Sequence, residues 1–99
     1  MVKWAAHAKA QLRHIHNYIA EDSPLYAKRV SEALVQCTDD LDTLPRKGKV
    51  VSELNEEAIR EYSLYSYRIL YEIKSDDLVI VLAVIHKRQH LESDDVPRN

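Results

Sequence analysis

The stretch VIHKRQHL, from Val84 to Leu91, places two histidines beside two cations directly after an apolar run. The pKa of an unperturbed histidine lies near neutrality, so His86 can act as a general acid or base. Lys87 and Arg88 can bind an anion, and an arginine can hold a phosphate through two parallel hydrogen bonds. The stretch therefore has three interpretations: an active site, an anion clamp, or the polar end of a buried strand.

Other cations with similar chemistry occur between residues 45 and 70. Arg60 and Arg68 are candidate phosphate ligands, whereas Lys47 and Lys49, together with Lys87, are candidate contacts to a nucleic-acid backbone. Each has an ordinary alternative, because a charged residue on a strand can equally be solvated or paired with a nearby glutamate. The residue types alone do not choose between these roles.

The remaining histidines do not predict a metal site. His14 and His16 are two residues apart on a predicted helix and point in different directions, and His7 lies about two turns before His14. The single cysteine excludes a multi-cysteine zinc site, and the chain has no glycine-rich phosphate loop. We expect no metal and no cofactor.

Two predicted strands position the candidate residues. Residues 78–85 are apolar at both parities and rich in β-branched side chains, which is typical of a central strand, and this strand ends at His86. In residues 67–74, aromatic and β-branched side chains alternate with the other residues. This alternation puts Arg68 on the sheet face opposite the helices, where we expect an open, shallow polar site.

A third strand, predicted at residues 59–64, is less informative. Tyr62 and Leu64 share parity with Arg60, so the apolar pattern does not assign Arg60 to either face of the sheet. The orientation of Arg60 therefore depends on the tertiary structure.

Two predicted helices precede these strands. Apolar residues recur at spacings of three and four between Ala8 and Ile19, which indicates an amphipathic helix. Ser23 followed by Pro24 is a helix-start signal, and a second apolar stripe runs from Ala27 to Leu44, where Pro45 ends it. The short connection between the helices predicts an antiparallel hairpin.

These elements predict an α+β fold. A short strand at residues 2–4 comes before the helical hairpin, which packs on one face of a mainly antiparallel sheet with a three-strand C-terminal meander. Residues 45–49, which include the only glycine, are expected to form an exposed turn. We expect one domain over residues 1–91 and a polar C-terminal tail over residues 92–99.

The bulk composition narrows the class of protein. The 99 residues are 45% hydrophobic and 30% charged, as in an ordinary globular domain. A net charge of -2 and a pI near 6.2 argue against a surface that binds nucleic acid everywhere, and leave only a local positive face. The sequence shows neither a signal-peptide pattern nor an apolar run long enough to cross a bilayer, so we expect a cytoplasmic protein without a membrane partner.

Four blocks of the sequence, in order and at the right spacing, resemble the RelE/ParE superfamily of toxins from bacterial type II toxin–antitoxin modules, also called plasmid-stabilisation proteins. The blocks are Trp4, Ala8, Leu12, Ile15, Tyr18-Ile19-Ala20, Asp22-Ser23-Pro24 and Ala27; Leu44-Pro45, Gly48-Lys49, Val51 and Glu53-Leu54; Ile59-Arg60-Glu61, Tyr67-Arg68-Ile69 and Tyr71; and Val84-Ile85-His86, Arg88 and Leu91. The sequence departs from the family pattern at Lys49 and at Arg88-Gln89, where arginine and paired arginines are usual. Bidentate guanidinium contacts are therefore not expected at positions 49 and 89.

The resemblance implies a growth-inhibiting toxin that is held inactive by a cognate antitoxin. RelE-like members cut messenger RNA on the ribosome, whereas ParE-like members act on DNA gyrase. A metal-independent endoribonuclease needs an acid, a base and cations around the phosphate, and its candidate catalytic residues in this chain are Arg60, Arg68, His86 and Arg88.

The acidic pI favours the ParE-like function over the RelE-like one, because an enzyme that works among RNA phosphates is expected to be basic. The gyrase inhibitor is thus our first hypothesis, the ribosome-dependent messenger-RNA endonuclease the second, and an inactive partner protein with the toxin fold the third. In each case we expect a hetero-oligomer with an antitoxin, whose disordered segment folds on the toxin surface.

Overall fold

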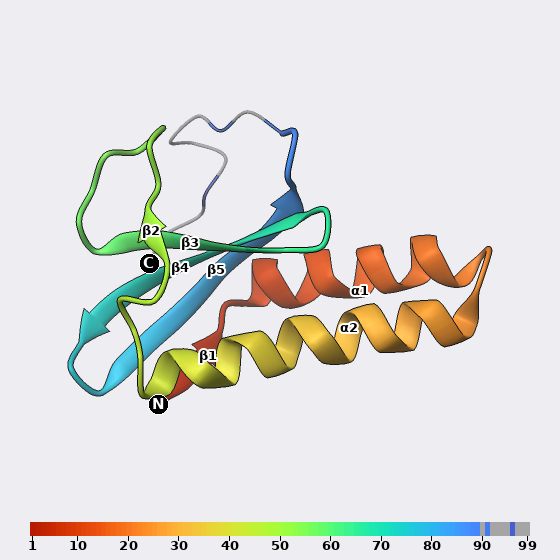
Figure 1. Ribbon diagram of the computed structural model, residues 1–99, viewed down its shortest axis with the longest axis horizontal. Helices are drawn as coiled ribbons and strands as arrows, with labels where there is room; N and C mark the ends of the chain where they lie inside the picture. Colours follow the sequence, from red (N-terminus) through yellow and green to blue (C-terminus); the bar gives the residue numbers. More distant parts are fainter. Residues whose placement is uncertain (90, 92–95, 97–99) are drawn as a thin grey trace.

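The computed structural model describes residues 1–89, 91 and 96. The elements in order are β1 (Val2–Trp4), α1 (Ala6–Ala20), α2 (Pro24–Asp39), the 3-10 helix η1 (Asp40–Asp42), β2 (Lys49–Val50), β3 (Ile59–Leu64), β4 (Tyr67–Ser75) and β5 (Leu78–His86). The strands form one sheet in the order β1-β5-β4-β3-β2, in which β1 is parallel to β5 and every other pair is antiparallel (Figure 1). The predicted α+β fold with its C-terminal meander is confirmed.

The helical hairpin begins and turns where the sequence predicts. The Ser23 hydroxyl caps α2 by accepting a hydrogen bond from the Tyr26 backbone N–H at 3.2 Å, and Pro24 follows at the first helical position. The two helices run side by side and extend beyond the edge of the sheet (Figure 1).

The second helix ends earlier than predicted. After Asp39 the chain tightens into η1, which still buries Leu41, but Leu44 is 59% exposed and belongs to the turn that follows. The prediction of a continuous apolar stripe to Leu44 was therefore wrong. The tighter 3-10 turn rotates later side chains off the apolar face, and Pro45 disfavours a helical conformation at Leu44.

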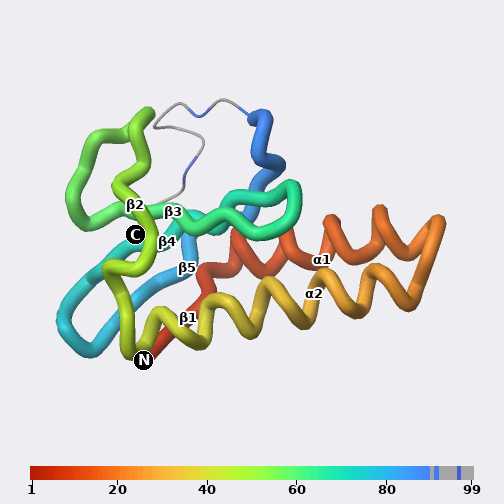
Figure 2. The backbone as a smooth tube through the Cα atoms, in the orientation of Figure 1, coloured from red at the N-terminus to blue at the C-terminus, as the bar shows by residue number. Residues whose placement is uncertain are grey.

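The core lies on both faces of the sheet. The helix-side core joins the two helices to β4 and β5, and its buried members are Ala8, Val30, Leu34, Ile69, Val81 and Val84. The far-side core, on the face away from the helices, has the buried members Val51, Ile59, Leu70, Leu82, Ala83, Ile85, Leu91 and Val96. The segment after β2 covers part of this far side (Figure 2), so the face is not open as predicted, although a shallow polar hollow remains on it around Arg68.

Gly48 is buried rather than part of an exposed turn. A Cβ at this position would lie 2.4 Å from the Glu61 carbonyl oxygen and 2.6 Å from the Tyr71 hydroxyl. That hydroxyl accepts a hydrogen bond from the Gly48 N–H at 2.9 Å and donates one to the Pro45 carbonyl at 2.7 Å. Glycine is required here by close packing, and the expectation of an exposed turn was wrong at this residue.

Of the predicted tail at residues 92–99, the structure describes only Val96. Its side chain is 3% exposed and packs in the far-side core, while the rest of the predicted tail lies outside the described residues. No helix in the described part of the chain is both long and apolar enough to cross a membrane.

Candidate functional site

Arg68 lies on the far side of the sheet between two glutamates. Its Nη1 and Nη2 donate to the two carboxylate oxygens of Glu53, at 2.9 Å each. Its Nε and Nη2 donate to the carboxylate of Glu61 at 3.1 and 2.6 Å, and Nη1 also reaches the Gln89 carbonyl at 3.3 Å. Carboxylates of the same chain therefore occupy the guanidinium edges that would otherwise hold a phosphate.

Glu53, Glu61 and Arg68 form a cluster that we call the Arg68 triad, in which hydrogen bonding favours the charged forms of Arg68 and Glu53. The Arg68 and Glu61 side chains are 8% and 6% exposed. The hydrogen bonds from Arg68 lower the pKa of Glu53 from its ordinary value of 4.5 to about 2. The hydrogen bonds to Glu53, followed by those to Glu61, raise the pKa of Arg68, so the guanidinium stays charged.

A shallow hollow of about 490 Å³ opens beside the triad. It is lined by Lys49, Ser52, Glu53, Glu61, Ser63, Arg68 and Lys87. The fold thus brings together Lys49 and Lys87, which are far apart in the sequence. Lys47 lies elsewhere, with its Nζ 3.5 Å from Asp40 and 4.6 Å from the centre of the Tyr62 ring.

Arg60 lies on the opposite face of the sheet from Arg68. It sits across from Tyr71, which packs on the helix side against Leu41. Its Nη1 donates to the Gly48 carbonyl at 3.0 Å, and its Nη2 pairs with Glu57. Arg60 therefore holds the segment before β2 against the sheet.

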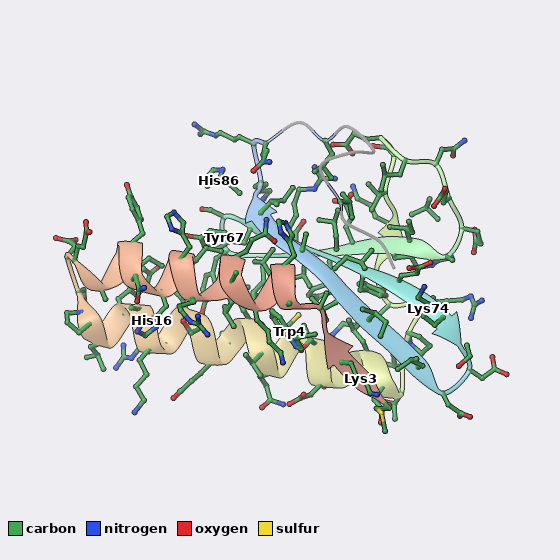
Figure 3. All side chains as sticks on the ribbon, turned by 180° about the vertical axis from the view of Figure 1, so that it is seen from behind. Lys3, Trp4, His16, Tyr67, Lys74 and His86 are labelled. Atoms are coloured by element: carbon green, nitrogen blue, oxygen red, sulfur yellow. The ribbon has the colours of Figure 1, made fainter. Side chains whose placement is uncertain are left out.

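His86 lies at the end of β5, on the helix side. Its ring meets the Tyr67 ring edge-on, with 6.0 Å between the centroids, and its Nδ1 accepts a hydrogen bond from the Arg88 backbone N–H at 3.2 Å. Both rings lie near α1 in Figure 3 and line a hollow of about 570 Å³ between α1 and β5. His86 and Arg88 are exposed.

Comparison with known proteins places these residues in a family. Residues 2–91 match the family described as ParE toxin of type II toxin-antitoxin system, parDE. The chain belongs to the ParE toxin family. It is also similar to a chain of the solved chromosomal ParDE TA system from P. aeruginosa, with 18% identity and a TM-score of 0.71 over 86% of this chain and 92% of that one, which shows a shared fold. No curated protein matches the chain.

In this ParE-family toxin, the predicted site residues fall into separate places. Arg68 lies with Lys49 and Lys87 on the far side, and Arg60 lies on the helix side near Gly48. His86 is paired with Tyr67 and Arg60 with Tyr71, so their positions along β4 differ by four residues, or roughly 13 Å. The four residues predicted for catalysis are therefore not brought to one point.

Sequence reasoning missed the importance of Glu53. Glu61 was a possible ion-pair partner in the sequence, but its face could not be assigned there, because strand alternation ties it to the unassigned face of Arg60; the structure places it opposite Arg60 and beside Arg68. Glu53 belongs to a segment without periodic structure, and only the path of that segment brings it to Arg68. Among the described residues, no group of three or more histidine, cysteine or acidic side chains is arranged to hold a metal ion.

Proposed function

We propose that this ParE-family toxin inhibits growth by acting on DNA gyrase and that a cognate antitoxin neutralises it. The observation that carries the proposal is the engagement of Arg68 by Glu53 and Glu61, which leaves its guanidinium no free edge for a phosphate. A toxin that acts by binding a protein target does not need a free phosphate-binding arginine. The separation of Arg60 from His86 supports the same conclusion.

One observation favours the second candidate, a RelE-like endonuclease that cuts messenger RNA on the ribosome. Lys49 and Lys87 line the same hollow as Arg68, and the two lysine side chains would bind the phosphates of an RNA backbone laid along this hollow. In this alternative, His86 and Arg88 would supply acid–base chemistry and charge, together with Arg60 and Arg68, and Lys47 would extend the contact to RNA. This candidate comes second, because Arg68 would first have to break its ion pairs with two carboxylates before it could bind a phosphate.

Two assays on the purified toxin separate the candidates. We expect the toxin to inhibit ATP-dependent supercoiling of relaxed plasmid by gyrase, and to leave ribosome-bound messenger RNA intact in a primer-extension assay. Addition of the antitoxin should restore supercoiling, which is the control for a specific effect. Cut message beside normal supercoiling would establish the RelE-like function, and no effect in either assay would establish the inactive partner protein.

The antitoxin is tested through the neighbouring gene. Co-expression of a short adjacent open reading frame should relieve growth inhibition, and the two proteins should co-purify as a hetero-oligomer. Equal growth inhibition with and without that frame would count against the assignment of that partner.

A further inference from the structure

The edge of β5 is only partly covered. β1 pairs with Val79–Val81, and the Ala5 N–H donates to the Val81 carbonyl at 2.9 Å before the chain turns into α1. β5 continues to His86, so its last residues have no neighbouring strand on this side. An uncovered strand edge offers backbone donors and acceptors to another chain.

The register identifies the backbone groups at this edge. The Lys87 N–H donates to the Ser66 carbonyl at 2.7 Å, so His86 and Val84 are the residues whose backbone groups point away from β4. The Val84 N–H is occupied by the Gln11 side-chain oxygen at 2.8 Å, and the His86 carbonyl by the Gln89 N–H at 3.0 Å. Within residues 1–89, 91 and 96, the Val84 carbonyl and the His86 N–H have no hydrogen-bond partner.

The free acceptor and donor favour a parallel strand, because an antiparallel strand would also direct a carbonyl at the Val84 N–H, which Gln11 already occupies. In a parallel pair, a single residue donates to one strand residue and accepts from the residue two places further along. The Val84 carbonyl and the His86 N–H are such a pair. A segment parallel to β5 would continue the line of β1 and would leave the bond between Gln11 and Val84 in place.

The hollow beside the edge favours an acidic segment with apolar anchors. It is lined by His7, Ala10, Gln11, His14, Ile15, Tyr18, Tyr67, Val84, Ile85, His86 and Gln89, a set without a carboxylate. The whole of α1 also lacks an acidic residue, and the exposed Lys87 and Arg88 follow β5 directly. Aliphatic or aromatic side chains of a bound segment would pack on the tyrosines, while its carboxylates would face cations.

From this geometry we infer that the edge of β5 at Val84–His86 binds an acidic, extended segment of another protein as a parallel strand. A nucleic-acid phosphate backbone fits less well, because its phosphate oxygens only accept hydrogen bonds and would leave the Val84 carbonyl unpaired. The toxin's net charge of -2 also weakens binding to a polyanion. The inference holds whichever molecule the toxin inhibits.

The probe is a synthetic octapeptide, acetyl-EDVEVYDE-amide, titrated into the isotopically labelled full-length toxin. We expect NMR shift changes at the amides of Val84 and His86. Binding should be at least about tenfold weaker for a peptide with lysine in place of its acids. In a series of peptides that each carry one N-methyl group at a central residue, binding should be about tenfold weaker for the peptide whose methylated residue donates to the Val84 carbonyl. The N-methylated peptides test the strand pairing without changing the toxin.

Two toxin variants complete the test. His86→Pro removes the outward N–H without removing a bond to β4, and should weaken binding roughly tenfold, whereas His86→Ala keeps the N–H and should weaken binding clearly less than His86→Pro. Lys87→Glu with Arg88→Glu should also weaken binding, with Lys28→Glu and Arg29→Glu on α2 as the matched control. Thermal unfolding confirms that each variant is folded.

Any one of three results with the peptides would overturn the inference. These are no binding at millimolar peptide, equal binding of the acidic and lysine peptides, and full affinity of every N-methylated peptide. A deoxythymidine decamer that shifts the same amides and outcompetes the acidic peptide would also overturn it, and would identify a nucleic-acid surface instead.

Discussion

The guanidinium of Arg68 and the carboxylate of Glu53 meet side by side, through two hydrogen bonds of 2.9 Å each. Glu53 belongs to the segment between β2 and β3, and Arg68 to β4. The pair therefore fastens an irregular segment to the sheet, over the far-side core. The pair thus stabilises the fold, and the effects of removing it on stability and on growth inhibition can be measured separately.

The pKa of Glu53 predicts how the pair depends on pH. In the folded protein this pKa is lowered to about 2 from 4.5, so the carboxylate stabilises the fold above pH 4.5 and loses this effect as the pH falls towards 2. We expect Glu53→Gln to lower the free energy of unfolding by about 1–3 kcal/mol at pH 7, and by clearly less at pH 3. Urea denaturation at both pH values measures the difference.

The matched control for this prediction is Glu32→Gln. Glu32 is exposed on α2 and lies 4.0 Å from Lys28, so its substitution should change stability little at either pH. An equal loss of stability for Glu53→Gln at pH 7 and pH 3 would show that the carboxylate charge is not what holds the segment.

Replacing Arg68 separates its structural role from a catalytic one. Arg68→Met alone leaves Glu53 and Glu61 without their shared cation, and should destabilise the fold by about 3–5 kcal/mol. Adding Glu53→Met and Glu61→Leu removes the unpaired carboxylates and should recover most of that loss, as measured by chemical denaturation.

Growth inhibition by the triple variant then tests the proposed function. We expect a stably folded triple variant to remain toxic, because a gyrase inhibitor does not need the Arg68 guanidinium for chemistry. The opposite outcome is a wild-type toxin that cuts messenger RNA and a folded triple variant that neither cuts it nor inhibits growth. That result would assign Arg68 to catalysis.

The packing of Gly48 predicts a steric effect. Gly48→Ala places a methyl group 2.4 Å from the Glu61 carbonyl oxygen and 2.6 Å from the Tyr71 hydroxyl. The backbone oxygen cannot move aside easily, so we expect a loss of about 1–3 kcal/mol in thermal or chemical unfolding. Lys49→Ala, at the exposed neighbouring residue, is the control and should have little effect.

His86 distinguishes the two functional candidates in cells. Its ring contacts Tyr67 at the exposed end of β5, so His86→Ala should leave the fold intact. If the toxin acts on gyrase, growth inhibition should persist at close to the wild-type level, whereas a nuclease that relies on His86 would lose its toxicity. Induced expression with growth curves measures the outcome, and equal protein levels of both forms are the necessary control.

Local periodicity in the sequence predicted most of the fold. Ser23 and Pro24 mark the start of α2, because a hydroxyl cap and a proline at the first position act within one turn. The alternation after Tyr67 correctly put Arg68 on the face away from the helices, because successive side chains of a strand point to opposite faces. These are properties of neighbouring residues, and the sequence determines them by itself.

Only the tertiary structure decided what Arg68 meets on that face. Its partner Glu53 lies fifteen positions earlier in an irregular segment, and the cover that this segment forms over the far side follows no period in the sequence. The same holds for Gly48, whose burial depends on a hydroxyl 23 residues later. Contacts between distant segments depend on the path of the chain through space, so whether Arg68 is an open phosphate ligand or a buried ion pair is decided by the folded structure alone.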